Sequence, residues 1–266
     1  MVWPFRARLP IDADELEFQL ATFKWLIAEF GPAGARGLIV PTAEHFPLSG
    51  ATGEEGVREV FDHVRAAAGM AGWPCELRAG ARDRPIDAGN SYLLRHEGKP
   101  APCGTFHVET GAAGRHGIIT YNPGMARDQA GLVATFAHEL GHYLMATAAT
   151  APPGGWELHE LHTDLIAVYL GFGTFMANHA RSFGHFSTGS GAGWQASWRG
   201  YLSEGALVTA TAIVERLAGR DPLTAAPWLK PYLQSDLKRT VRALARLAPD
   251  MAAAVEAVDL GDYAAE

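Results

Sequence analysis

The stretch "ATFAHELGHYLMATA", residues 134–148, holds two histidines four positions apart, His138 and His142, with Glu139 beside the first. On a helix, residues at this spacing lie one turn apart on one face, so both imidazoles face the same way. Two unpaired imidazoles on a buried helix are costly, and a zinc ion would give both nitrogens a partner. The residues that predict burial of this helix are Leu132, Val133, Phe136, Leu140, Tyr143 and Leu144.

A second segment downstream offers a third ligand. In "WELHELHTDLIAVYLGFG", residues 156–173, Glu160 follows His142 by 18 positions. Asp164 lies one helical turn beyond Glu160, on the same face. Composition alone would produce this joint pattern in about one chain in a thousand. The two segments together therefore predict a metal site.

Other assignments of these residues stay open from the sequence. Glu160 is a solvated helix residue in one alternative, with Glu157 or His162 as the third ligand. His162 has suitable chemistry, but it is two positions from Glu160 and should face elsewhere on a helix. In a second alternative, His138 and His142 are hydrogen-bonded core residues and no metal binds.

The order HExxH, a loop containing Pro and Gly, and ExxxD resembles the signature of the gluzincin metallopeptidases, the thermolysin-like clan. The resemblance covers about residues 104–176, and its compactness is similar to that of the smallest members, the minigluzincins. It implies one zinc ion per chain, with Glu139 as general base and Asp164 as the partner that holds His138. The implied zinc ligands are His138, His142 and Glu160. The implied edge strand for an extended peptide is Ile118, Ile119, Thr120 and Tyr121, in "GIITYN".

The chemistry expected of such a site follows from its residues. Three protein ligands leave a position for water, whose pKa zinc lowers toward neutrality. Glu139 is placed to take a proton from that water and pass it to the leaving amine. A peptidase also needs a donor for the oxyanion, which no motif here identifies. The candidates for that donor are Tyr201, His185 and His179.

Composition narrows the class of protein. The chain has 266 residues, 48% of them hydrophobic, and a formal net charge of −7, so nucleic acid is disfavoured as a partner. Cys75 and Cys103 form no CxxC pair and are expected to be free thiols. The charged N-terminal stretch does not resemble a signal peptide, and no apolar run approaches the length of a membrane span. A cytoplasmic protein is expected, with its oligomeric state left open.

The expected fold class is α+β, with a zincin-like core made of a small sheet with an edge strand, the HExxH helix and the ExxxD helix. The expected sections are an N-terminal α/β section (1–90), the zinc core (91–200) and C-terminal helices (201–266). Residues 178–200 are expected to form a loop. Periodicity and turn residues predict helices over 12–30, 54–70, 128–148, 156–171, 201–218 and 234–258, and strands over 37–41, 74–79, 104–110 and 116–122.

The leading expectation for function is zinc-dependent hydrolysis of a peptide bond, in a peptide or small protein substrate. The alternative is a zinc-binding regulatory or protein-interaction module with little or no turnover. An intact Glu139 favours the enzyme, because a purely structural site has no need of a base there. A zinc hydrolase of non-peptide amides is a third reading, which only a substrate screen separates from the first.

Overall fold

The structure, a computed structural model, describes residues 8–35, 37–80, 103–111, 114–184 and 201–263. The α-helices are α1 (Ala13–Phe30), α2 (Gly53–Ala67), α3 (Gln129–Met145), α4 (His159–Ala167), α5 (Gly173–Gly184), α7 (Glu204–Leu217), α8 (Pro231–Leu247) and α9 (Met251–Glu256). The strands are β1 (Cys75–Ala79), β2 (Gly104–Gly111) and β3 (Gly114–Tyr121). Single 3-10 turns cover Pro123–Met125, Trp156–Leu158, Pro222–Trp228 and Leu260–Tyr263, and a π-helical segment covers Val168–Phe172. The chain is thus α+β, as predicted.

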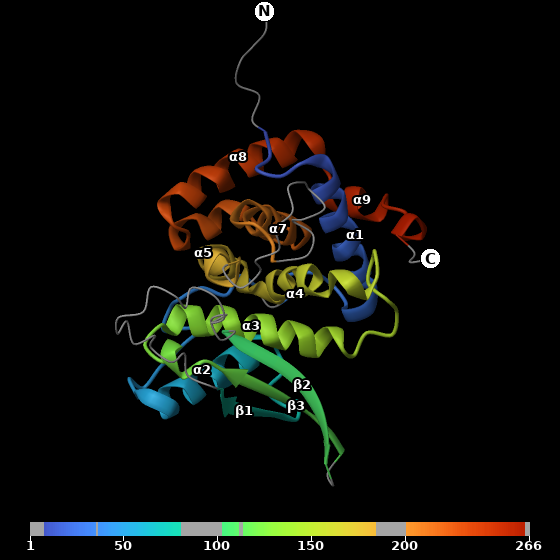
Figure 1. Cartoon of the computed structure of the whole chain (residues 1–266). Coiled ribbons are helices and arrows are strands. Elements are labelled where there is room, and N and C mark those ends of the chain that lie inside the picture. Colours follow the sequence, from blue (N-terminus) through green and yellow to red (C-terminus); the bar gives the residue numbers. More distant parts are fainter. Residues whose placement is uncertain (1–7, 36, 81–102, 112–113, 185–200, 264–266) are drawn as a thin grey trace, which may run out of the picture.

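Helix α3, which carries the HExxH residues, has the sheet and α2 on one side and the other helices on the opposite side (Figure 1). It packs against α2, β2 and β3 on one side and against α4 and α5 on the other. Asp128 caps it, accepting a hydrogen bond from the Gly131 N–H at 2.9 Å, as predicted. Phe136 and Leu140 are fully buried. The motif therefore sits on a rigid helix enclosed from both sides.

The sheet has the order β1-β3-β2, so β3 is its central strand. It pairs in parallel with β1 and in antiparallel with β2, which confirms the predicted hairpin. The predicted edge strand, Ile118–Tyr121, is therefore wrong, because its backbone pairs on both sides. Ile118 and Ile119 point to opposite faces and are both fully buried, as expected of a central strand. Among the described residues, β2 pairs with β3 alone and forms the edge next to α3.

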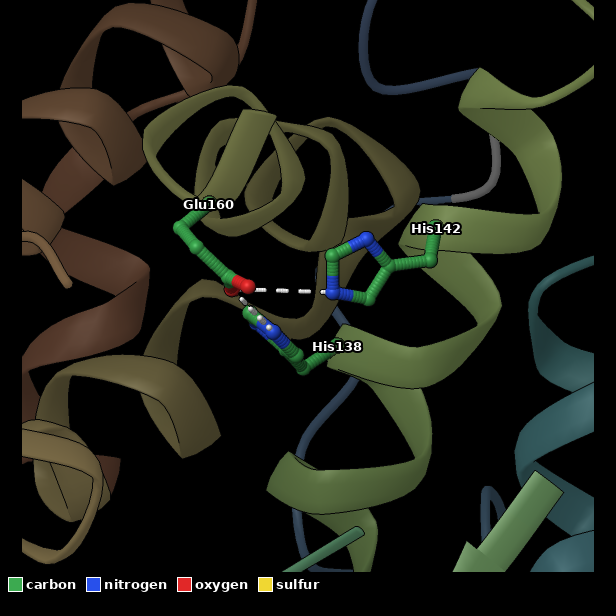
Figure 2. A group of neighbouring side chains, drawn as sticks. All are labelled: His138, His142 and Glu160. Carbon is green, nitrogen blue, oxygen red and sulfur yellow. Dashed lines mark hydrogen bonds and ion pairs between the residues drawn. The ribbon is translucent and has the colours of Figure 1, made fainter. Parts of the chain in front are cut away.

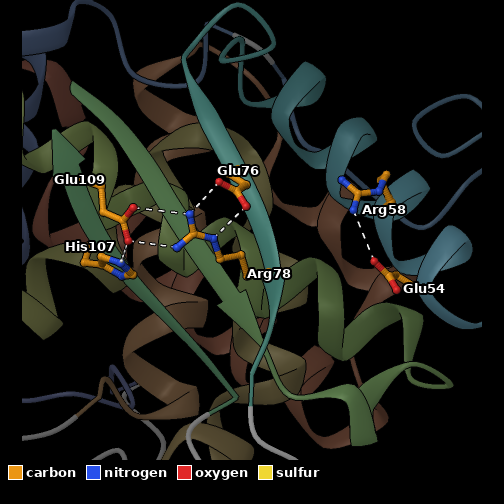
Figure 3. A network of polar contacts seen from close by, with 6 residues as sticks. All are labelled: Glu54, Arg58, Glu76, Arg78, His107 and Glu109. Atoms are coloured by element: carbon orange, nitrogen blue, oxygen red, sulfur yellow. Dashed lines mark hydrogen bonds and ion pairs between the residues drawn. The ribbon is translucent and has the colours of Figure 1, made fainter. Parts of the chain in front are cut away.

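A polar network ties the two outer strands together across β3 (Figure 3). Arg78 of β1 binds Glu76 at 2.8 Å and reaches Glu109 of β2 at 3.0 Å. His107 completes the network through Glu109 at 3.2 Å. Ile118 lies in register between Glu76 and His107, so these long polar side chains lie over a buried apolar residue. These ion pairs are exposed, so water screens them and they add little to stability.

Residues 37–41 were predicted to form a strand, and this is wrong. The segment is bonded to the junction of α4 and α5 instead of to a strand: the Ile39 N–H donates to the Gly171 carbonyl at 3.0 Å, and Thr174 Oγ1 donates to the Ile39 carbonyl at 3.4 Å. Gly171 has φ of +103° inside the π-helical segment. This residue lets the chain turn from α4 into α5. The sequence predicted that the helix ends at residue 171 and that a loop begins at residue 178. That prediction is wrong for residues 178–184, which belong to α5.

The C-terminal helices differ from expectation at one point. The predicted helix at 201–218 is confirmed as α7, whereas the one predicted over 234–258 is two helices, α8 and α9. The break falls at Ala248, with φ −137° and ψ 71°, because Pro249 disfavours helical backbone in the residue before it.

The described residues share one cluster of buried apolar side chains, whose first member in the sequence is Phe18 and whose last is Met251. Among the described residues, no helix combines the length and apolar character that crossing a membrane requires. Cys75 and Cys103 are both thiols. The division at residues 90 and 200 stays a prediction, because both boundaries lie outside the described residues.

Replacing Gly171 with alanine should destabilise the fold more than the same change at Gly31. Both have positive φ, +103° and +94°, so alanine is strained at either position, at a cost of about 1–3 kcal/mol. A Cβ on Gly171 would also stand 2.4 Å from the Gly37 carbonyl oxygen, whereas one on Gly31 meets nothing within 4 Å. Urea unfolding should show an extra loss of about 1–3 kcal/mol for Gly171→Ala. Equal losses would contradict the close contact at Gly37.

Candidate metal centre

Three side chains from two helices converge on one point (Figure 2). His138 and His142 project from α3 toward Glu160 of α4. Glu160 Oε2 lies 3.1 Å from His138 Nε2 and 3.6 Å from His142 Nε2. One donor atom from each residue lies within 4.8 Å of the other two, a grouping that could hold a metal ion. This is the ligand set that the sequence predicts.

Two of the three donor separations are compatible with a tetrahedral ion. Two ligand atoms bonded to one zinc at about 2.0–2.1 Å lie about 3.3 Å apart. The two separations from Glu160 Oε2, 3.1 Å and 3.6 Å, bracket that value. The His138 side chain is 2% exposed and that of Glu160 33%, so the centre is dry on one side and open on the other. The three side chains could therefore hold a metal ion that is accessible from the side of Glu160.

The charges at the centre act on the protonation of its ligands. Burial disfavours the charged imidazole of His138, but hydrogen bonds to Asp164 and Glu160 outweigh burial and raise its pKa to about 10. Burial lowers the pKa of His142, against the opposing effect of Glu160. The pKa of Glu160 is lowered, since its bonds to the two histidines outweigh its burial. A metal ion that binds here takes the place of a proton on His138.

The short helix α4 carries Glu160. It also supplies a hydrogen-bonding or ion-pair partner for the side-chain atom of His138, His142 and Glu160 that faces away from the centre. His138 Nδ1 lies 3.0 Å from Asp164 Oδ1, as predicted. The other two partners were not predicted, although they fall on the same face of α4 as Glu160 and Asp164, at three- and four-residue spacing. These are Thr163 Oγ1, 3.1 Å from His142 Nδ1, and His159 Nε2, 3.2 Å from Glu160 Oε1.

Asp164 also connects the centre to the start of α7. Its second oxygen, Oδ2, accepts a hydrogen bond from the Leu202 backbone N–H at 2.8 Å. This bond brings Tyr201 to the site, with its ring centroid 5.3 Å from that of His138. Burial raises the pKa of Tyr201, and the nearby carboxylates add to the effect, so the phenol keeps its proton. Tyr201 is thus a predicted candidate that the structure places beside the ligands.

The two other candidates for the oxyanion donor have different outcomes. His179 lies on α5, with Nδ1 3.0 Å from the Phe175 carbonyl and Nε2 4.0 Å from Asp128 at the start of α3. Asp128 precedes His138 by ten residues, about 15 Å along a helix, so His179 is remote from the ligands. His185 lies outside the described residues.

The alternative third ligands do not reach the centre. His162 is fully buried on another face of α4, where Nε2 meets the Pro153 carbonyl at 2.9 Å and Nδ1 meets Thr22 Oγ1 at 3.2 Å. Burial lowers the pKa of His162 to about 4, so it is a neutral core histidine. Glu157 is exposed on the turn before α4. Among the described residues, Glu160 alone joins the two histidines in a possible metal-binding group.

Glu139 follows His138 on α3, and its side chain lies against the edge strand β2. Its side chain is buried, and burial raises its pKa to about 7, with Glu160 acting in the same direction and His138 against it. On the β2 side it meets Gly104, where an added Cβ would stand 2.9 Å from Glu139 Oε1. The absence of a side chain at Gly104 therefore leaves room for this carboxylate.

The fold and the site define an α+β protein with a candidate His-His-Glu metal centre and a buried carboxylate beside it. No protein-family model matches the chain, and neither a curated protein nor a solved structure matches it. The resemblance to gluzincins thus stays a prediction that rests on the motif residues.

Proposed function

We propose that this chain is a zinc-dependent peptidase whose ligands are His138, His142 and Glu160. The proposal is carried by the position of Glu139, whose buried carboxylate lies against the edge strand β2 and interacts electrostatically with His138 and Glu160. A structural metal site needs no such carboxylate, whereas hydrolysis needs a base between the metal and the substrate. The two-histidine, one-carboxylate donor set also suits zinc, with a coordination position left open.

Each residue then has a defined task. Bound zinc would supply Lewis-acid activation of water and of the scissile carbonyl. Glu139 accepts a proton from the attacking water and donates it to the leaving amine. Asp164 holds the His138 ring through Nδ1 and, through the Leu202 N–H, keeps Tyr201 beside the ligands. The Tyr201 phenol is the described group best placed to donate a hydrogen bond to the oxyanion.

The register of the sheet supports pairing of an extended peptide along β2. The Asn122 N–H donates to the Cys103 carbonyl at 3.0 Å, which marks a hydrogen-bonded pair of the β2–β3 ladder. Such pairs alternate along antiparallel strands. It follows that Gly104, Phe106 and Val108 direct their N–H and C=O groups away from β3. This outward row starts beside Glu139 and can bind a substrate backbone by strand addition.

A Val108→Pro variant tests this pairing. Proline removes an N–H that faces the open edge of β2 and leaves the β2–β3 ladder intact. We expect unchanged zinc content and a fall in kcat/KM of roughly 3–10-fold, the value of one hydrogen bond. Val108→Ala, which keeps the N–H and removes most of the side chain, is the matched control. Equal kinetics in both variants would remove the edge strand from the mechanism.

The proposed activity itself is tested by incubating the zinc-loaded protein with a peptide library and identifying products by mass spectrometry. We expect cleavage that a chelator abolishes and added zinc restores. Zinc binding with no cleavage of any peptide would instead favour the zinc-binding regulatory or interaction module. Cleavage confined to small non-peptide amides would keep the metal chemistry and change the substrate class.

A further inference from the structure

The hydroxyl of Thr163 lies between a ligand and a backbone carbonyl. Thr163 Oγ1 is 3.1 Å from His142 Nδ1 and 2.7 Å from the carbonyl oxygen of His159, one turn earlier in α4. Thr163 is fully buried. The contact depends on a close crossing of α3 and α4, because a Cβ on Gly141 would stand 2.9 Å from the Thr163 carbonyl oxygen. Gly141 thus allows Thr163 to reach His142.

The direction of these bonds determines the protonation of the ring. A hydroxyl has one hydrogen to donate, and the His159 carbonyl can only accept. The Thr163 hydrogen therefore points to His159, and its oxygen accepts from His142, which must carry its proton on Nδ1. The bare nitrogen is then Nε2, the atom that faces Glu160.

We propose that Thr163 is a positioning residue that holds His142 as the Nδ1–H tautomer and so presents Nε2 to the metal. The assignment rests on the metal centre of the proposed function, but not on turnover. The His142 side chain is 17% exposed, against 2% for His138, so packing restrains the His142 ring less. The bond to Thr163 therefore matters more for orienting His142 than the bond to Asp164 does for His138. A neutral hydroxyl also leaves the ring uncharged and ready to bind a cation.

The first test measures zinc affinity by competition with a chromophoric chelator. Thr163→Val keeps the shape of the side chain and removes the hydroxyl, and we expect zinc to bind about 10–100-fold more weakly. Thr163→Ser restores the hydroxyl and should return the affinity to near the wild-type value. Thr240→Val is the matched control, since Thr240 is a fully buried helical threonine whose hydroxyl has no hydrogen-bond partner among the described residues. It should leave zinc affinity unchanged.

The second test reads the tautomer directly from the ¹⁵N shifts of the His142 ring in the metal-free protein at neutral pH. We expect the proton on Nδ1 in the wild type and in Thr163→Ser, and a mixture of tautomers in Thr163→Val. A wild-type ring protonated on Nε2 would overturn the assignment, as would unchanged zinc affinity in Thr163→Val. A protein that gives the expected tautomers and zinc affinities but cleaves no peptide would contradict the proposed function and support the role of Thr163.

Discussion

Replacing Glu139 with glutamine is expected to lower kcat by about 10²–10⁴-fold while zinc stays bound. The amide has the shape of the carboxylate, so the buried site beside Gly104 remains filled. It cannot take a proton from water, and the leaving amine then departs without a proton donor. Steady-state kinetics on a peptide found in the library screen, with zinc content measured on the same sample, test this expectation.

The two readings of the site predict different results for this variant. In the proposed enzyme, activity falls and metal content does not change. In a structural or regulatory zinc site, the wild type itself has little or no turnover, and metal content again does not change because Glu139 is not a ligand. Full activity in Glu139→Gln would show that another group acts as base, and loss of zinc would show that Glu139 belongs to the ligand set instead.

The Glu160→Ala variant is expected to lose zinc affinity by more than about 100-fold. Removing an outer partner of a ligand already costs about 10–100-fold, and loss of a ligand should cost more. Glu160 Oε2 lies within reach of the Nε2 atoms of both histidines, so alanine removes the carboxylate that faces these two atoms. Chelator competition on the purified variant gives the affinity.

Glu157→Ala is the matched control, because Glu157 lies three residues earlier, is exposed, and is the acidic alternative to Glu160 as third ligand. Its zinc affinity should equal that of the wild type. Retention of zinc by Glu160→Ala together with its loss in Glu157→Ala would mean that α4 turns a different face to the centre.

Local spacing was enough to predict which side chains share a face within each of the two helices. His138 and His142 share a face of α3 because they are four residues apart, and the same rule places Asp164 one turn from Glu160 on α4. The roles of Thr163 and His159 depend on how closely α3 and α4 cross, which Gly141 permits. That contact joins segments some twenty residues apart, and no periodicity within one helix reveals it.

The sheet order could not be read from the hairpin alone. The sequence predicts that β2 and β3 pair, but the position of β1 depends on a connection that runs from residue 79 to residue 104. One signal was present: Ile118 and Ile119 are adjacent and both apolar, which is typical of a strand covered on both faces. Read in that way, "GIITYN" predicts a central strand and leaves β2 as the edge.

Helix α5 was not predicted because a glycine at its start can either end a helix or allow two helices to pack closely. "GFG" at residues 171–173 resembles a helix end, yet only Gly171 takes positive φ, and the chain re-enters a helix at Gly173. Gly173 is itself a packing position, since a Cβ there would stand 2.2 Å from Thr211 Oγ1 of α7. A glycine that allows two helices to approach cannot be told from one that ends a helix without knowing the neighbour.

The central claim is that His138, His142 and Glu160 hold a zinc ion. Elemental mass spectrometry of the purified wild-type protein, before and after dialysis against zinc, tests it most directly. The geometry of the three donor atoms predicts about one zinc per chain, as expected for a single three-ligand site. A protein that carries no metal after zinc reconstitution would contradict the metal centre and, with it, the proposed peptidase.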